Sequence, residues 1–83
     1  MFSKALFGER LRTLRKETGE TQEDLAELLG VSRPQVSEIE QGNKGTSLER
    51  FALLCAHYNV SADYLLGLTD ERRPLEKNQR KFV

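Results

Sequence analysis

The sequence predicts one compact all-α domain of five short helices. Its 83 residues lie near the lower limit at which an apolar core alone holds a fold, so there is room for one domain. Apolar residues recur at helical spacing, and serine, threonine and glycine divide the chain into short segments. The composition, 37% hydrophobic and 31% charged, is typical of a globular protein. We expect the domain to span residues 1–69, followed by a charged tail over residues 70–83.

The first helix is predicted from about Ser3 to Thr18. Phe7, Leu11 and Leu14 form one apolar stripe along it. Basic side chains flank the stripe, and they are Arg10, Arg12, Arg15 and Lys16. Gly19 ends the helix.

The second helix is predicted to begin at Thr21, an N-cap candidate with an acid, Asp24, three residues later. Its apolar face consists of Leu25, Ala26 and Leu29. Gly30 ends this helix, because glycine readily adopts the left-handed backbone that closes a helix and turns the chain.

The third helix is predicted to begin at Ser32, only two residues after Gly30. Gln35 can complete a capping box with Ser32, and Pro34 lies in the first turn, where a missing N–H costs nothing. Val36 and Ile39 are expected to face the core. Two helices so close in sequence must cross at a steep angle, which lets one brace the other in the major groove of DNA. The second and third helices therefore predict a DNA-binding helix-turn-helix.

Polar side chains on the outer face of the third helix are the candidates for reading bases. Arg33 can bind guanine O6 and N7 with its planar fork. Glu38 is unfavourable near phosphates unless it accepts a hydrogen bond from cytosine N4 or pairs with Arg33, and both roles stay open. Pro34 offers a thymine methyl an apolar surface, or serves only to start the helix. The predicted base contacts are Arg33, Pro34, Ser37 and Glu38, with Gln41 further along the same face.

A fourth helix is predicted from Thr46 or Ser47 to about Tyr58. Its inward-facing residues are expected to be Leu48, Phe51, Leu54, Cys55 and Tyr58. Asn59 and Val60 break this pattern. A short fifth helix, Ala62 to Leu66, follows Ser61 and ends at Gly67.

Two segments, FGERLRTLRKETGETQEDLAELLGVSRPQVSEIEQG and SLERFALLCAHYNVSADYLLG, carry a resemblance that covers about residues 7–67. They resemble the lambda-repressor and Cro type of helix-turn-helix domain, also called the xenobiotic-response-element type. The resemblance implies that Gln22 holds a DNA phosphate and braces the third helix. It also implies an internal salt bridge between Arg15 and Glu40. Further phosphate contacts are expected from Gln35, Asn43 and Lys44.

Several apolar residues depart from the family pattern. They are Phe2, Leu6, Leu28, Leu66, Leu68 and Leu75. Surplus apolar surface indicates either a dimer interface or a cover formed by the tail, and both readings stay open. The tail itself is expected to be mobile, or else an arm whose Leu75 and Phe82 dock on a partner subunit.

The net charge of zero is unusual for a DNA-binding protein, because phosphate neutralisation supplies much of the affinity. The charges are nevertheless segregated along the chain. Residues 1–19 carry five basic and two acidic side chains, whereas residues 20–30 carry four acidic ones and no basic one. Because the net charge is zero, we still expect weak nonspecific binding and a small salt dependence.

No residue pattern indicates catalysis, a metal or a cofactor. Cys55 lies between apolar neighbours and is expected to be a core residue. His57 has no second histidine or cysteine at metal-ligand spacing. We also find no apolar run near the roughly 20 residues of a membrane span, nor a signal-peptide pattern, so we expect a cytoplasmic protein associated with the nucleoid.

Together these features predict a sequence-specific DNA-binding transcriptional regulator without enzymatic activity. We expect a small phage-type or bacterial repressor that binds a near-palindromic operator in double-stranded DNA as a homodimer. The alternative is a protein-interaction module on the same fold, an antitoxin or a protein of the antirepressor type, favoured by the zero net charge, Glu38 and the surplus leucines.

Overall fold

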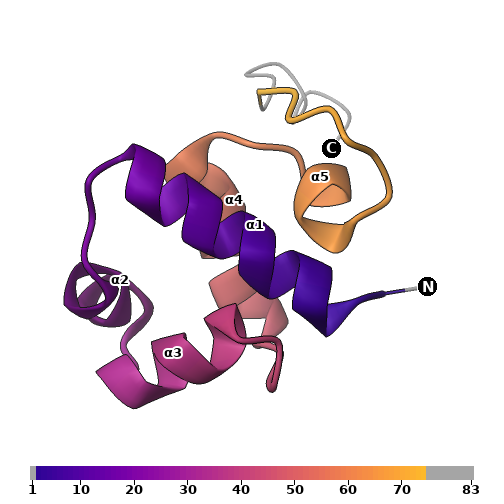
Figure 1. Ribbon diagram of the computed structural model, residues 1–83. Coiled ribbons are helices and arrows are strands. Elements are labelled where there is room, and N and C mark those ends of the chain that lie inside the picture. Colours follow the sequence, from indigo (N-terminus) through magenta and orange to yellow (C-terminus); the bar gives the residue numbers. More distant parts are fainter. Residues whose placement is uncertain (1, 75–83) are drawn as a thin grey trace.

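Five helices make up the described part of the chain, as predicted. The computed structural model describes residues 2–74, so Leu75 and Phe82 lie outside the described residues. The helices are α1 (Lys4–Glu17), α2 (Gln22–Leu29), α3 (Arg33–Glu40), α4 (Leu48–Tyr58) and α5 (Ala62–Leu66). In Figure 1, α1 crosses the centre of the molecule, with α2 and α3 on one side and α5 on the other. The all-α class and the helix-turn-helix position of α2 and α3 are confirmed.

Each helix begins after a serine or threonine whose side chain accepts a hydrogen bond from a backbone N–H in the first turn. These N-caps are Ser3, Thr21, Ser32, Ser47 and Ser61. The predicted capping box between Ser32 and Gln35 is present, and a second box joins Thr21, the predicted N-cap, to Asp24. Since each such cap contributes about 0.5–2 kcal/mol, caps largely determine where these short helices start.

The turn between α2 and α3 takes the predicted form. Gly30 has φ +71°, in the left-handed region. Val31 donates its N–H to the Ala26 carbonyl at 3.0 Å and packs partly buried against the core. The two helices are therefore held at a fixed angle by a closed turn and an apolar plug.

The core lies where all five helices meet. Its fully buried large side chains are Phe7, Leu11, Leu25, Val36, Leu54 and Leu65. Leu48 was predicted to face inward, and this is wrong: its side chain is 84% exposed. The apolar stripe of α4 continues one turn beyond the edge of the core, so its first residue borders an open groove instead. That groove, about 240 Å³, also collects Phe2 and Leu66, two of the surplus apolar residues.

Gly8 sets the distance between α1 and α3. A Cβ atom at this position would lie 2.2 Å from the Ile39 carbonyl oxygen and 2.7 Å from that of Glu40. Only glycine therefore allows the backbone of α1 to approach the end of α3 this closely.

Residues 68–73 continue past α5, on the side of the molecule away from α3 (Figure 1), and side chains of α1 contact them. Arg10 donates to the Thr69 carbonyl at 2.7 Å and pairs with Asp70 at 2.7 Å. Arg72 pairs with Glu17 at 2.6 Å, and its carbonyl accepts the Ser61 N–H at 2.9 Å. The boundary that we predict after residue 69 and the behaviour of the tail beyond residue 74 stay predictions.

Candidate nucleic-acid interface

The outer face of α3 is open, as a groove-reading helix requires. Arg33, Pro34 and Gln35 are exposed, and Ser37 and Glu38 are partly exposed. The opposite face of α3 contributes Val36 and Ile39 to the core. This division leaves the predicted base-contacting side chains accessible on a helix whose other face is fixed.

Hydrogen bonds link several of these polar side chains at the C-terminal end of α3. Gln41 donates from Nε2 to Ser37 Oγ at 3.0 Å. Asn43 donates from Nδ2 to Glu38 Oε1 at 3.1 Å and lies 3.4 Å from Gln41 Oε1. Asn43 therefore orients the Glu38 carboxylate. The sequence offers Arg33 as a partner of Glu38 and does not indicate Asn43, although the glycine at position 42 signals that the chain turns back there.

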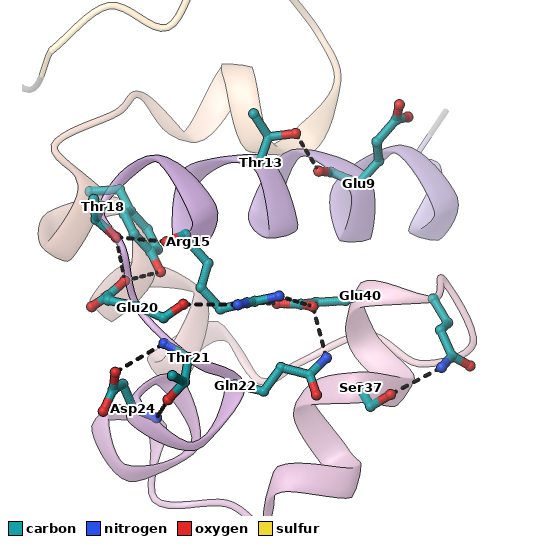
Figure 2. A network of polar contacts seen from close by, with 12 residues as sticks. Glu9, Thr13, Arg15, Thr18, Glu20, Thr21, Gln22, Asp24, Ser37 and Glu40 are labelled. Carbon is teal, nitrogen blue, oxygen red and sulfur yellow. Dashed lines mark hydrogen bonds and ion pairs between the residues drawn. The ribbon is translucent and has the colours of Figure 1, made fainter.

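A buried ion pair braces α3 from behind (Figure 2). Arg15 Nε lies 2.6 Å from Glu40 Oε2, and Arg15 NH2 donates to Glu40 Oε1 at 3.1 Å. The hydrogen bond from Arg15 to Glu40, opposed by burial, raises the pKa of Arg15. Gln22 Nε2 donates to Glu40 Oε1 at 3.0 Å. One carboxylate thus ties α1, α2 and α3 together, and the phosphate contact predicted for Gln22 stays a prediction.

Gln35 and Lys44 both line one pocket on the α4 side of α3. The Gln35 Oε1 atom accepts the Ser32 N–H at 2.8 Å in the capping box. The side chain therefore starts the helix, and only its amide nitrogen remains for the predicted phosphate contact.

The charges divide between the two sides of the molecule, which explains how a net charge of zero suits this interface. On the α5 side, arginines form ion pairs: Arg10 with Asp70 at 2.7 Å, Arg72 with Glu17 at 2.6 Å and Arg73 with Asp63 at 3.7 Å. Five basic side chains make no ion pair or hydrogen bond with any residue of 2–74; Lys4 and Lys16 are two of them, and Arg12, Arg33 and Lys44, which line depressions beside α3, are the others. The three cations beside α3 are therefore available for phosphate, while the arginines on the α5 side are paired within the protein.

A second polar cluster, missed by the sequence reasoning, fixes the turn between α1 and α2. The Glu20 carboxylate accepts hydrogen bonds from Tyr58 Oη at 2.7 Å and Thr18 Oγ1 at 2.8 Å, and lies 2.6 Å from His57 Nε2. Burial opposes the charge of Glu20, but these hydrogen bonds together outweigh it and lower the pKa of Glu20. The cluster anchors the start of α2 on α4.

The structure also bears on the thiol, on metal-ligating side chains and on membrane-spanning helices. Cys55 is buried and its thiol is free. Burial raises the pKa of Cys55, which disfavours the reactive thiolate. No group of three or more metal-ligating side chains gathers within residues 2–74. Among these residues there is also no helix with the length and apolar character needed to cross a membrane.

Comparison with known proteins identifies the class. A family described as a helix-turn-helix domain matches residues 6–68, and the chain belongs to this family. The chain is 38% identical over 80 residues to YobD of Bacillus subtilis, an uncharacterised regulator of transcription of the helix-turn-helix type. This match covers 94% of the chain and 71% of YobD.

A solved structure places the fold more closely. The P22 c2 repressor protein, determined in complex with a synthetic operator, is 34% identical, with a TM-score of 0.68. The match covers 74% of this chain and 92% of the repressor chain. The predicted resemblance to the lambda-repressor and Cro type is confirmed, and with it the class of sequence-specific DNA-binding transcriptional regulators.

A further relative bears on the alternative reading. The antitoxin PezA of Streptococcus pneumoniae is 31% identical over 71 residues, which are 86% of this chain. The chain spans 45% of the length of PezA. The helix-turn-helix domain thus also occurs as one part of a larger antitoxin.

Proposed function

We propose that the protein is a repressor that occupies a near-palindromic operator and acts by binding, without catalysis. Its most direct support is the arrangement around α3, an exposed polar helix face braced by a buried ion pair and flanked by three unpaired cations. A domain bound in the major groove excludes other proteins from the same DNA without any catalysed reaction. We accordingly assign it to the cytoplasm, on the nucleoid.

Sequence reading is assigned to the leading end and outer face of α3. Arg33 is exposed and unpaired within the described residues, so its guanidinium is free to bind guanine O6 and N7. Glu38, whose carboxylate Asn43 contacts at 3.1 Å, would accept a hydrogen bond from cytosine N4. Ser37 and Pro34 lie on the same face and complete the proposed set of base contacts.

Phosphate contacts are assigned to the two flanks of α3. Lys44 and Gln35 line one flank, and Gln22 lies beside Arg33 on the other. Asn43 lies at the end of α3, where its amide also faces Glu38. These side chains would hold the domain in register without specifying sequence.

The proposed repressor binds DNA as a homodimer. A single helix-turn-helix domain reads one half-site, and two copies about 34 Å apart read two half-sites one helical turn apart. A two-fold protein assembly would therefore select a near-palindromic site.

Selection of bound duplexes from a random library, at about physiological salt, tests this function. We expect enrichment of a two-fold symmetric site, and Arg33→Ala should relax the preference at one base pair in each half. Enrichment of asymmetric single sites with one bound monomer would contradict the dimer. If no site is enriched although the protein is folded, the repressor function is wrong.

The second candidate is a protein-interaction module, and the similarity to an antitoxin favours it. In that case the protein would co-purify in fixed stoichiometry with a protein partner and show no measurable DNA affinity. Arg33→Ala would then leave the complex intact.

A further inference from the structure

A depression beside the buried ion pair borders the proposed contacts of Gln22 and Ser37 and includes a further cation, Arg12. Side chains of three helices line its volume of about 260 Å³, and they are Arg12, Arg15, Gln22, Ser37, Glu40 and Gln41. It lies between α1 and α3, next to the outer face that is proposed to read bases. Arg12 is one of the unpaired cations near α3, and no specific contact has been assigned to it.

The position of Arg12 follows from the contact between α1 and α3. Gly8 touches the end of α3 through the backbone, and Arg15, seven residues on, lies on the same face and is buried against Glu40. Arg12 is four residues beyond Gly8 and three before Arg15, so it neighbours both along the helix surface. It is exposed, at the edge of this face, and reaches over the depression instead of into the core.

The charge of the depression favours an anion. Glu40 could oppose one, but its carboxylate accepts from Arg15 and Gln22 and its side chain is only 3% exposed. Arg15 therefore compensates Glu40, whereas Arg12 has no ion pair or hydrogen bond within residues 2–74. One uncompensated positive charge remains, surrounded by polar side chains that can donate to oxygen.

The geometry of α3 places this charge where a second DNA strand would lie. Gln35 lines one depression together with Lys44, and Ser37 lines the other together with Arg12. Gln35 and Ser37 are two residues apart, which corresponds to a rotation of about 200° around the axis of α3. The two depressions therefore flank α3 on opposite sides. A helix in the major groove has a phosphate backbone on each side, so one cation per side matches the DNA.

We propose that Arg12 binds a backbone phosphate of the DNA strand on the α1 side of the groove, opposite the strand contacted by Lys44. This inference rests on the proposed DNA-binding function and adds a site to it. A phosphate contact of this kind raises affinity for all sequences alike and adds about 0.9 to the salt slope of binding.

The experiment measures the affinity of wild type, Arg12→Gln and Arg12→Lys for the selected duplex between about 50 and 200 mM salt, and repeats the library selection for each. Arg12→Gln should weaken binding. The ratio of wild-type to variant affinity should fall about threefold to fourfold as the salt concentration rises across that range. Its selected sequence should equal that of wild type. Arg12→Lys keeps the charge and should keep the slope.

Arg73→Gln is the matched control, because it removes the same charge from an exposed arginine on the α5 side, paired at 3.7 Å with Asp63. If Arg73→Gln lowers affinity and slope as much as Arg12→Gln, long-range charge explains the effect and the inference is overturned. Wild-type affinity and slope in Arg12→Gln would overturn it as well, with the repressor function intact. A wild-type protein that binds no duplex at any salt would overturn both.

Discussion

The guanidinium of Arg15 and the carboxylate of Glu40 form an ion pair at 2.6 Å with only 10% and 3% of their side chains exposed. The two residues come from α1 and α3, and Gln22 of α2 joins the same carboxylate (Figure 2). One buried ion pair thus helps to fix the position of α3 against the other two helices. Removing either partner of a buried pair leaves the other uncompensated, which is far more costly than losing a surface pair.

Glu40→Ala should therefore lower the free energy of unfolding by about 3–5 kcal/mol. In a domain of this size, the melting temperature should fall by more than about 10 °C. Thermal unfolding followed by circular dichroism measures both quantities. Glu17→Ala, which removes the exposed partner of Arg72, is the control and should change the melting temperature little. Equal melting temperatures for Glu40→Ala and wild type would show that the pair contributes no stability.

Gly8→Ala should destabilise the protein although alanine is the better helix former. The added methyl would lie 2.2 Å from the Ile39 carbonyl oxygen, so α1 and α3 must move apart. We expect a loss of about 1–3 kcal/mol, as for overpacked cores, against a propensity gain of up to about 1 kcal/mol. Urea unfolding provides the measurement. Gly45→Ala, where a Cβ meets nothing within 4 Å, is the matched control. A stabilised Gly8→Ala variant would contradict the close approach.

The features of the fold that sequence predicted well are those encoded locally. Ser32 and Gln35 carry a capping box within four residues, and Gly30 marks the left-handed turn before them. The limits of α5 agree with the prediction, because Ser61 and Gly67 enclose it. Local hydrogen bonds and backbone freedom decide such positions, and both depend on neighbouring residues alone.

Features that depend on contacts between distant segments were missed. In the sequence, Gly8 is only a residue of low helix propensity. Its role depends on the close approach of α3, which the sequence does not show. Leu48 continues an apolar stripe whose periodicity cannot tell where the core ends. The pairing of Arg72 with Glu17, 55 residues apart, likewise has no local signal. The candidate site divides in the same way, since Arg33 followed from its place in the motif, whereas Arg12 required knowledge of which helix faces α3.

Acid should weaken the Glu20 cluster. The pKa of Glu20 is lowered in the folded state, so its carboxylate contributes stability above the unfolded pKa of about 4.3 and loses it as the pH falls through the folded value. Glu20→Gln should therefore be less stable than wild type at pH 6, and the difference should shrink below about pH 4.3. Unfolding free energies measured from pH 6 to pH 3 test this prediction.

Tyr58→Phe is the companion variant, because it removes one hydrogen bond to Glu20 and leaves the ring in place. Its acid dependence should lie between those of wild type and Glu20→Gln. A constant difference between wild type and Glu20→Gln at every pH would show that the cluster does not stabilise the carboxylate.

The hydrogen bond from Asn43 to Glu38 predicts an effect on base preference from a residue outside α3. Asn43 holds the Glu38 carboxylate at 3.1 Å, so Asn43→Ala should free that carboxylate to rotate. If Glu38 reads cytosine as proposed, Asn43→Ala should relax the preference at the base pair that Glu38→Ala also relaxes. Library selection with the two single variants and the double variant measures this, and the double variant should relax no further base pair.

Lys44→Gln is the control for this prediction. Lys44 is next in the loop but is exposed and unpaired within residues 2–74, so the substitution should lower the salt slope and leave the selected sequence unchanged. An Asn43→Ala variant that behaves like Lys44→Gln would make Asn43 a phosphate contact only.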